Sequence, residues 1–263
     1  MKTTDQSATP SAAVRYAREG PVAWLTLNRP EARNALNAAA RDGLRDGFER
    51  FEADAEARVL AVTGAGDRAF CAGGDLKEIA DRRLGPPPPN FMPYLNQTVT
   101  VTKPVIAAVN GDALGGGFLL AQMCDLCVTA DTARFGITEA RWGRGAPWAA
   151  PLAWLIPPRV AMELLLTARP IDAHRAYEVG LVNRVVPGAE LQRTVQGIGE
   201  LIAANAPLSV KAGKALVYAA AEAGWTEALV AGYRLFDPVY RSDDAQEGPR
   251  AFTERRQPRW TGT

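Results

Sequence analysis

Short apolar runs alternate with helix-period segments in the first half of the chain, and this alternation restricts the fold more than any other feature. The runs at 22–27, 58–64, 103–111 and 126–130 have the length and apolar content of buried strands. Between the first two runs, Leu36, Leu44, Phe48 and Phe51 recur with a helical period, which predicts a helix over 35–54. Strands separated by helices indicate an α/β fold with a parallel or mostly parallel sheet.

The second half of the chain, after about residue 146, is predominantly helical. Helices are predicted over 159–168, 172–180, 190–206 and 207–224, with a short strand at 182–187, and two further helices follow. The segment 84–93 contains four consecutive prolines, which fit neither a helix interior nor a central strand. It is therefore predicted to be a surface loop, and such loops often cover functional sites.

Charge and composition exclude several classes of partner and mechanism. The 263 residues carry a net charge of +1, so neither nucleic acid nor a membrane surface is expected as a partner. No apolar run approaches the ~20 residues of a membrane span, and residues 1–14 are expected to be a polar, disordered leader. The three cysteines lie in apolar stretches and the single histidine, His174, falls in the first turn of a predicted helix. We expect no metal site, no Ser-His or Cys-His mechanism, and a reduced, cytoplasmic setting.

Two glycine-rich turns are the segments most suited to chemistry. "CAGGD" (71–75) can present the main-chain N–H of Ala72, and "LGGGF" (114–118) can present that of Gly116 at the start of an apolar helix. Rigid N–H groups of this kind can hold a negatively charged oxygen. Each turn alone is equally an ordinary strand-to-helix connection. Cys71 is interpreted as a small packing residue, since no histidine is placed to activate it.

The chain resembles the crotonase family, the enoyl-CoA hydratase/isomerase superfamily, from about Val22 to Trp260. The resemblance rests on "LNRPEARNALN", "AFCAGGDL", "NGDALGGGFLLAQMCDL", "FGITEA" and "AMELLLTARPIDAHRAYEVGLVNRVVP", which occur in the family's order and spacing. It implies an α/β fold with a crotonase-like ββα superhelix core and a C-terminal helical trimerisation region. It also implies that the substrate is an acyl-CoA thioester and that the amides of Ala72 and Gly116 form an oxyanion hole.

The resemblance also implies where coenzyme A is held. Backbone groups would frame it in two segments, the turn after the first strand and the first glycine-rich turn. Basic residues near the C-terminus could meet its phosphates, although each of these is equally a solvated side chain. The residues concerned are Ala32 and Arg33, then Ala72, Gly74, Asp75 and Leu76, with Gly115 and Leu119 at the second turn, and Arg255, Arg256 and Arg259 near the C-terminus.

The acid/base residues depart from the family pattern. Family hydratases usually have two glutamates, but Leu119 occupies the first position, and only Glu139 is kept, with Thr138 in place of the usual proline. A carboxyl group in an apolar pocket would have a raised pKa and could exchange protons near neutral pH. The alternative for Glu139 is an ordinary exposed loop carboxylate. Trp142 and Trp148 are expected to line a reshaped acyl pocket.

A single acid/base group suits a proton transfer between two carbons of one enolate, so isomerase-type chemistry is preferred over hydration. Hydration by Glu139 alone, hydrolase or decarboxylase chemistry, and a weakly catalytic thioester-binding protein remain as alternatives. Apart from coenzyme A as part of the substrate, no cofactor is expected, and a homotrimer or hexamer is expected. The predicted organisation is a leader at 1–14, a core with the active site at 15–200, and a helical region at 201–263 that oligomerises and covers coenzyme A.

Overall fold

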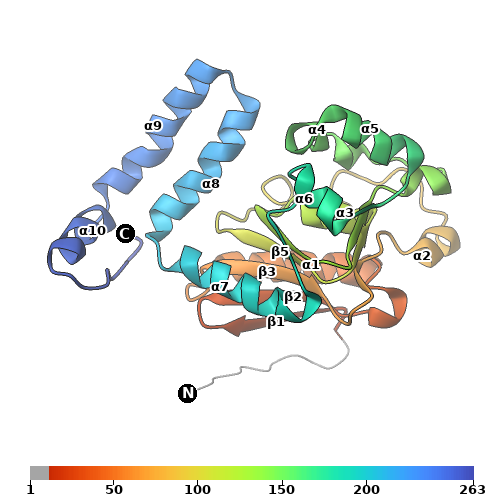
Figure 1. The fold of residues 1–263 in the computed structure, drawn as a ribbon, viewed down its shortest axis with the longest axis horizontal. Helices are drawn as coiled ribbons and strands as arrows, with labels where there is room; N and C mark the ends of the chain where they lie inside the picture. The colour runs from red at the N-terminus through yellow and green to blue at the C-terminus, as the bar shows by residue number, and fades with distance from the viewer. Residues whose placement is uncertain (1–11) are drawn as a thin grey trace.

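The computed structural model describes residues 12–263 and places a large, mostly parallel sheet at the centre of the molecule (Figure 1). Its strands, in spatial order, are β1 (Val14–Glu19), β2 (Val22–Leu27), β3 (Val59–Gly64), β5 (Val105–Val109), β7 (Leu126–Ala130) and β10 (Arg184–Val186). β1 pairs antiparallel with β2, and every other neighbouring pair is parallel. The expected α/β class is therefore confirmed.

Both faces of this sheet are covered, as is usual for parallel strands. Successive side chains of a strand point to opposite faces. Ala23 and Leu25 of β2 belong to the main core, which includes helix α1 (Ala38–Ala53), whereas Val22 and Trp24 pack with Leu191 and Val195, which lie at the start and in the middle of helix α7 (Leu191–Ala203). This two-sided burial explains why the central strands read as continuous apolar runs.

A second, smaller sheet carries the segments that form the candidate site. It consists of β4 (Ala69–Cys71), β6 (Asp112–Leu114), β8 (Arg134–Gly136) and β9 (Ile171–Asp172), in that order. The pairs β4–β6 and β6–β8 are parallel, and β8–β9 is antiparallel. These strands, which are two or three residues long, were not predicted, because so short a run carries no readable period.

Most of the helices were predicted, with shifted ends, whereas Leu76–Asp81 and Leu152–Leu155 were not. The helices are α1, α2 (Leu76–Asp81), α3 (Gly116–Gln122), α4 (Leu152–Leu155), α5 (Pro158–Thr167), α6 (Ala173–Glu178), α7, α8 (Pro207–Glu222), α9 (Trp225–Arg241) and α10 (Asp244–Thr253), with short 3-10 turns at Pro30–Ala32, Glu139–Trp142, Pro147–Ala149 and Gly188–Glu190. The side chain of Asn37 accepts a hydrogen bond from Ala40 N at 3.0 Å and caps α1. Leu36 therefore lies outside this helix, contrary to the expectation, and its N–H donates to Gly73 O at 2.8 Å.

Two expected boundaries differ from the structure. Residues 1–11 of the expected leader lie outside the described residues, but Val14 already begins β1, so the leader cannot extend to residue 14 as expected. The expected division between residues 200 and 201 falls within α7, which packs on the sheet. The helices that leave the core begin instead at Pro207, the first residue of α8.

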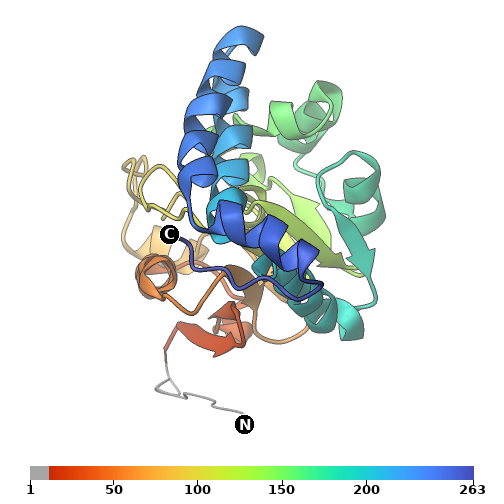
Figure 2. The ribbon, with the colours of Figure 1, turned by 90° about the vertical axis from the view of Figure 1, so that its left-hand side faces the viewer.

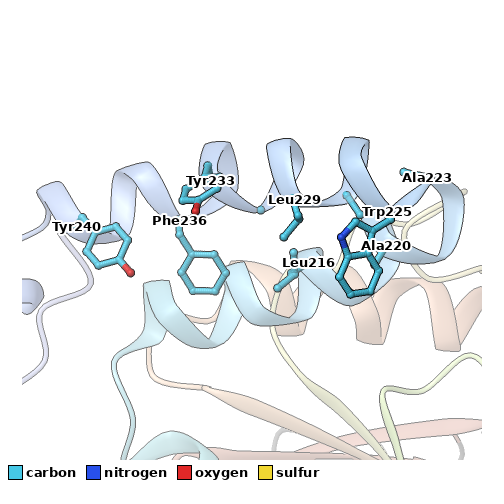
Figure 3. Close-up of a pocket in the computed structure, with 10 residues that line it drawn as sticks. Leu216, Ala220, Ala223, Trp225, Leu229, Tyr233, Phe236 and Tyr240 are labelled. Carbon is cyan, nitrogen blue, oxygen red and sulfur yellow. The ribbon is translucent and has the colours of Figure 1, made fainter.

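Helices α8 and α9 form a hairpin that stands away from the sheets in two perpendicular views (Figures 1 and 2). Lys214 holds α8 to the core through an ion pair with Asp125, with a nitrogen–oxygen distance of 2.8 Å. None of the 17 residues of α9 is buried. Figure 3 shows the groove between the two helices, with Leu229 and Phe236 of α9 directed toward α8.

Candidate active site

The three segments expected to carry the chemistry leave the smaller sheet at one edge. β4 ends at Cys71, β6 at Leu114 and β8 at Gly136, and these three strands are parallel neighbours. Because carboxyl ends of parallel strands meet at the same edge, the residues after them converge. The two glycine-rich turns and the Glu139 segment, which are separated by some forty and twenty residues of sequence, thus line one cavity.

Close packing between the first turn and helix α3 requires glycine at particular positions. A Cβ atom on Gly117 would collide with the carbonyl oxygen of Cys71. Gly73 has a φ of +96°, and a Cβ there would lie 2.8 Å from Leu114 O and 3.2 Å from Gly116 N. The glycines therefore allow the two turns to approach backbone to backbone.

Within the described part of the chain, two main-chain N–H groups where the turns meet are free to bind a ligand. One of them, Gly116, was predicted, and the other is Gly74 instead of the predicted Ala72. Gly116 is the first residue of α3, and its N–H has no acceptor among residues 12–263. The N–H of Ala72 is engaged, because it donates to Arg33 O at 3.0 Å, so the expected donor at Ala72 is not free. The N–H of Gly74 has no acceptor among the same described residues, and a Cβ on Gly116 would lie 3.7 Å from Gly74 N.

Glu139 lies beside these amides, half-buried, rather than on an open loop. Its Oε1 atom would lie 3.1 Å from a Cβ on Gly115, a residue whose φ of +54° also favours glycine. Its Oε2 atom is fully buried and has no hydrogen-bond partner within the described part of the chain. Burial raises the pKa of this carboxyl group above its ordinary value. The raised pKa moves this carboxyl group toward the range in which one group can both accept and donate a proton.

The cavity has a volume of about 600 Å³ and a largely apolar wall. Leu119, which is 3% exposed, lies one turn into α3, so the position of the missing glutamate is apolar in space as well as in sequence. Trp148 packs against Phe118 with ring centroids 6.1 Å apart, and Trp142 is 60% exposed at the wall. Of the predicted site residues, the cavity is lined by Ala72, Gly74, Leu76, Gly115, Gly116, Leu119, Glu139, Trp142 and Trp148.

The remaining predicted residues lie outside the cavity wall. Ala32 and Arg33 belong to the turn after β2, and Arg33 lines a separate polar depression with Arg68 and Arg134. The carboxylate of Asp75 caps α2 and pairs with Arg29 at 3.0 Å, which is a structural role. Near the C-terminus, Arg256 is paired with Glu247 and Glu254.

The proline-rich loop covers one side of the cavity, as the sequence suggested for 84–93. It contributes Gly85 to Pro89, Phe91, Met92 and Tyr94 to the wall. Arg144, from the segment after Glu139, donates hydrogen bonds to Leu84 O at 2.9 Å and Gly85 O at 3.1 Å. On the other side, the Arg41 guanidinium lies 4.1 Å from the ring centroid of Phe91. Sequence reasoning missed Tyr94 and Arg144, and the loop's position in space is what identifies them.

Cys71 is a packing residue. Its side chain is fully buried in the main core, and burial raises the pKa of its thiol to about 12. A thiol in this state is not a nucleophile near neutral pH. Within residues 12–263, no helix is long and apolar enough to cross a membrane.

Comparison with known proteins identifies the class. Residues 17–263 match the family described as enoyl-CoA hydratase/isomerase. A carnitinyl-CoA dehydratase from Citrobacter koseri is 38% identical over 266 residues, covering 96% of this chain and 99% of that protein. A solved enoyl-CoA hydratase from Mycobacterium tuberculosis is 37% identical, with a TM-score of 0.87 and coverage of 96% of this chain and 100% of the other.

A second solved enoyl-CoA hydratase, from Bacillus anthracis, is 32% identical, with a TM-score of 0.86 and coverage of 95% of this chain and 100% of the other. The fold and these matches define an enzyme of the crotonase superfamily. The chain belongs to the enoyl-CoA hydratase/isomerase family.

The buried carboxyl group of Glu139 should make stability depend on pH. Because the folded-state pKa is raised, ionisation of Glu139 destabilises the folded protein as pH rises through that pKa. We expect Glu139→Gln to raise the melting temperature at pH 8 relative to the parent, and the gain to vanish below about pH 4, where the carboxyl group is protonated in both states. Thermal denaturation across this range measures it. Glu49→Gln, an exposed control on α1, should show no such pH-dependent gain; equal behaviour of the two variants would contradict the assignment.

Proposed function

We propose that this enzyme forms an enolate from an acyl-CoA thioester, with Glu139 moving the proton at carbon-2. The observation that supports this most is the unpartnered, buried Glu139 Oε2 in the same cavity as the free amides of Gly74 and Gly116. Coenzyme A enters as part of the substrate, and the chemistry needs no separate cofactor.

The proposed oxyanion hole consists of the N–H groups of Gly74 and Gly116. When a proton leaves carbon-2, negative charge develops on the thioester oxygen, and two fixed donors stabilise it without reorganisation. Gly116 adds the positive end of the α3 dipole. Gly74 replaces Ala72 in this proposal because the Ala72 amide is already bound to Arg33 O.

With one carboxyl group, the reaction that the site supports directly is isomerase-type transfer. Glu139 would take the proton from carbon-2 of a 3-enoyl thioester and return it at carbon-4, so that the double bond moves into conjugation. Protons and electrons balance within the substrate, and the enzyme ends in its starting state. The pKa of Glu139 is raised by burial, which favours a group that must both accept and donate the proton.

Hydration and its reverse, dehydration, form the second candidate. It is favoured by the similarity of the chain to a carnitinyl-CoA dehydratase and to an enoyl-CoA hydratase. A comparison of 2-enoyl, 3-enoyl and 3-hydroxyacyl thioesters, followed by absorbance and mass, distinguishes the two candidates.

We also propose that the α8–α9 hairpin binds other copies of this chain, as a trimer or a dimer of trimers. The hairpin exposes Trp225, Tyr233 and Tyr240 by 85%, 81% and 76%, around the groove shown in Figure 3. Apolar surface of this kind is unusual on a monomer and typical of an association site. A second copy of the chain is the proposed partner, because most soluble oligomers are built from identical chains and each copy exposes the same apolar surface.

Replacement of the base should abolish proton exchange without loss of binding. Glu139→Gln is nearly isosteric, so acyl-CoA affinity should persist while exchange of the carbon-2 proton with deuterated water falls by roughly 10²–10⁴. NMR of a bound saturated acyl-CoA measures the exchange, and Glu49→Gln should exchange like the parent. If Glu139→Gln exchanges as fast as the parent, Glu139 is a structural residue.

Two substitutions of Gly116 distinguish the loss of its N–H donor from the effect of an added side chain. Proline suits the first position of a helix, so Gly116→Pro removes the N–H with little strain, and turnover should fall by about 10²–10³. Gly116→Ala adds a Cβ, 3.1 Å from a terminal methyl group of the buried Leu36 side chain, but keeps the donor. It should lose far less activity. Equal losses in the two variants, both folded by circular dichroism, would show that the donor is not used.

Self-association should depend on the hairpin. Leu229→Lys places a charge on a half-exposed apolar position of α9 and should shift sedimentation equilibrium toward the monomer. Met162→Lys, at a similarly exposed apolar position on α5, is the control and should leave the assembly intact. A parent protein that is strictly monomeric at micromolar concentration would refute the interface.

A further inference from the structure

Dehydration of a 3-hydroxyacyl thioester moves two protons, one from carbon-2 and one onto the departing oxygen of carbon-3. Glu139 can serve the first, and the second step is helped by a separate proton donor. The first turn of α3 offers none, because Leu119 is apolar and buried. A second donor must therefore come from another part of the cavity wall.

Among the described residues that line the cavity, the ionisable side chains are Glu139, Arg144 and Tyr94. Arg144 is a poor proton donor, because a guanidinium does not lose its proton in proteins. Its terminal nitrogens also donate to Leu84 O and Gly85 O, which fixes it to the loop. Tyr94 is the remaining group that can give up a proton.

The backbone around Tyr94 is held firmly by hydrogen bonds within its own turn. Tyr94 N donates to Thr98 Oγ1 at 2.8 Å, and Tyr94 O accepts from Gln97 N, Thr98 N and Val99 N at 3.2, 3.0 and 3.1 Å. Arg45 donates to Asn90 O at 3.0 Å and ties the same loop to α1. Tyr94 lines the cavity and is partly buried, while its backbone N–H and C=O groups are both engaged in the turn.

The hydroxyl group of Tyr94 is unoccupied by other protein groups. It has no hydrogen-bond partner among residues 12–263, and burial is the cause that raises its pKa. The phenol therefore stays protonated near neutral pH, which is the state a proton donor needs. Tyr16 and Tyr218, by contrast, donate their hydroxyl groups to Asp54 and Asp125.

We propose that Tyr94 is the second proton-transfer residue of this site and acts at the oxygen on carbon-3. This rests on the proposed enolate chemistry and deepens its hydratase-type candidate. Glu139 takes the carbon-2 proton to give the enolate, whose electrons then form the double bond between carbon-2 and carbon-3 as the carbon–oxygen bond breaks. Tyr94 gives its phenolic proton to the leaving oxygen, which departs as water. The proton on Glu139 then returns to the Tyr94 phenolate through that water, so the enzyme is restored.

Tyr94→Phe tests the proposal, because it removes one oxygen atom and keeps the ring and every backbone contact. Dehydration of a panel of 3-hydroxyacyl-CoA thioesters, followed by the absorbance of the enoyl product, should fall by roughly 10²–10⁴. Exchange of the carbon-2 proton of a saturated acyl-CoA, followed by NMR, should stay within about twofold of the parent, since that step needs Glu139 alone. Tyr177→Phe, an exposed tyrosine on α6, should leave both rates unchanged.

Three results would overturn the role of Tyr94. They are dehydration by Tyr94→Phe at the parental rate, a parallel fall of dehydration and exchange in a variant with an unchanged melting temperature, and a parent that dehydrates no thioester of the panel. Failure of the proposed enolate chemistry is a different result, because it would appear as undiminished exchange in Glu139→Gln. The two variants therefore separate the two hypotheses.

Discussion

The parallel pairing of β4, β6 and β8 is the constraint on which the site depends. It brings the ends of three strands to one edge and so places the Gly74 turn, the Gly116 turn and Glu139 around one cavity. The pairing tolerates no side chain between the first turn and α3, because a Cβ on Gly117 would meet the Cys71 carbonyl. Backbone-to-backbone contact thus fixes the positions of the two amides that serve as donors in the proposed oxyanion hole.

The rest of the cavity wall is built from loops, which are held by side-chain contacts and not by strand pairing. Arg144 and Arg41 both fasten the proline-rich loop, so this wall of the cavity is held by side-chain hydrogen bonds to main-chain carbonyl groups and by a cation–π contact. The wall is largely apolar, and the same burial that raises the pKa of Glu139 raises that of Tyr94. Desolvation therefore favours the protonated form of both groups in the same cavity.

The C-terminal helices differ from one another in how much of their surface is buried within this chain. α7 completes the sheet by covering its second face, whereas α9 buries none of its residues within this chain. A 17-residue helix of this kind gains little from its own hairpin, since packing of an apolar face supplies most helical stability in proteins. The proposed association would supply that packing, and it accounts for aromatic residues at the groove that a monomer would leave in water.

The sequence by itself determined the α/β class, the central strands, the helical second half and the proline-rich loop, because these follow from periodicity and from proline. Glu139 as the single retained carboxylate followed from the resemblance to the family's motifs. It did not reveal the short strands of the smaller sheet, whose pairing partners are distant in the chain. Nor did it identify which amide of "CAGGD" is free. Only the tertiary structure decided that, because Arg33 O takes up the Ala72 N–H when the turn after β2 packs against this segment, leaving Gly74 to face the cavity. Tyr94 joined the site for the same reason, since folding of the proline-rich loop over the cavity, and no local pattern, brings it there.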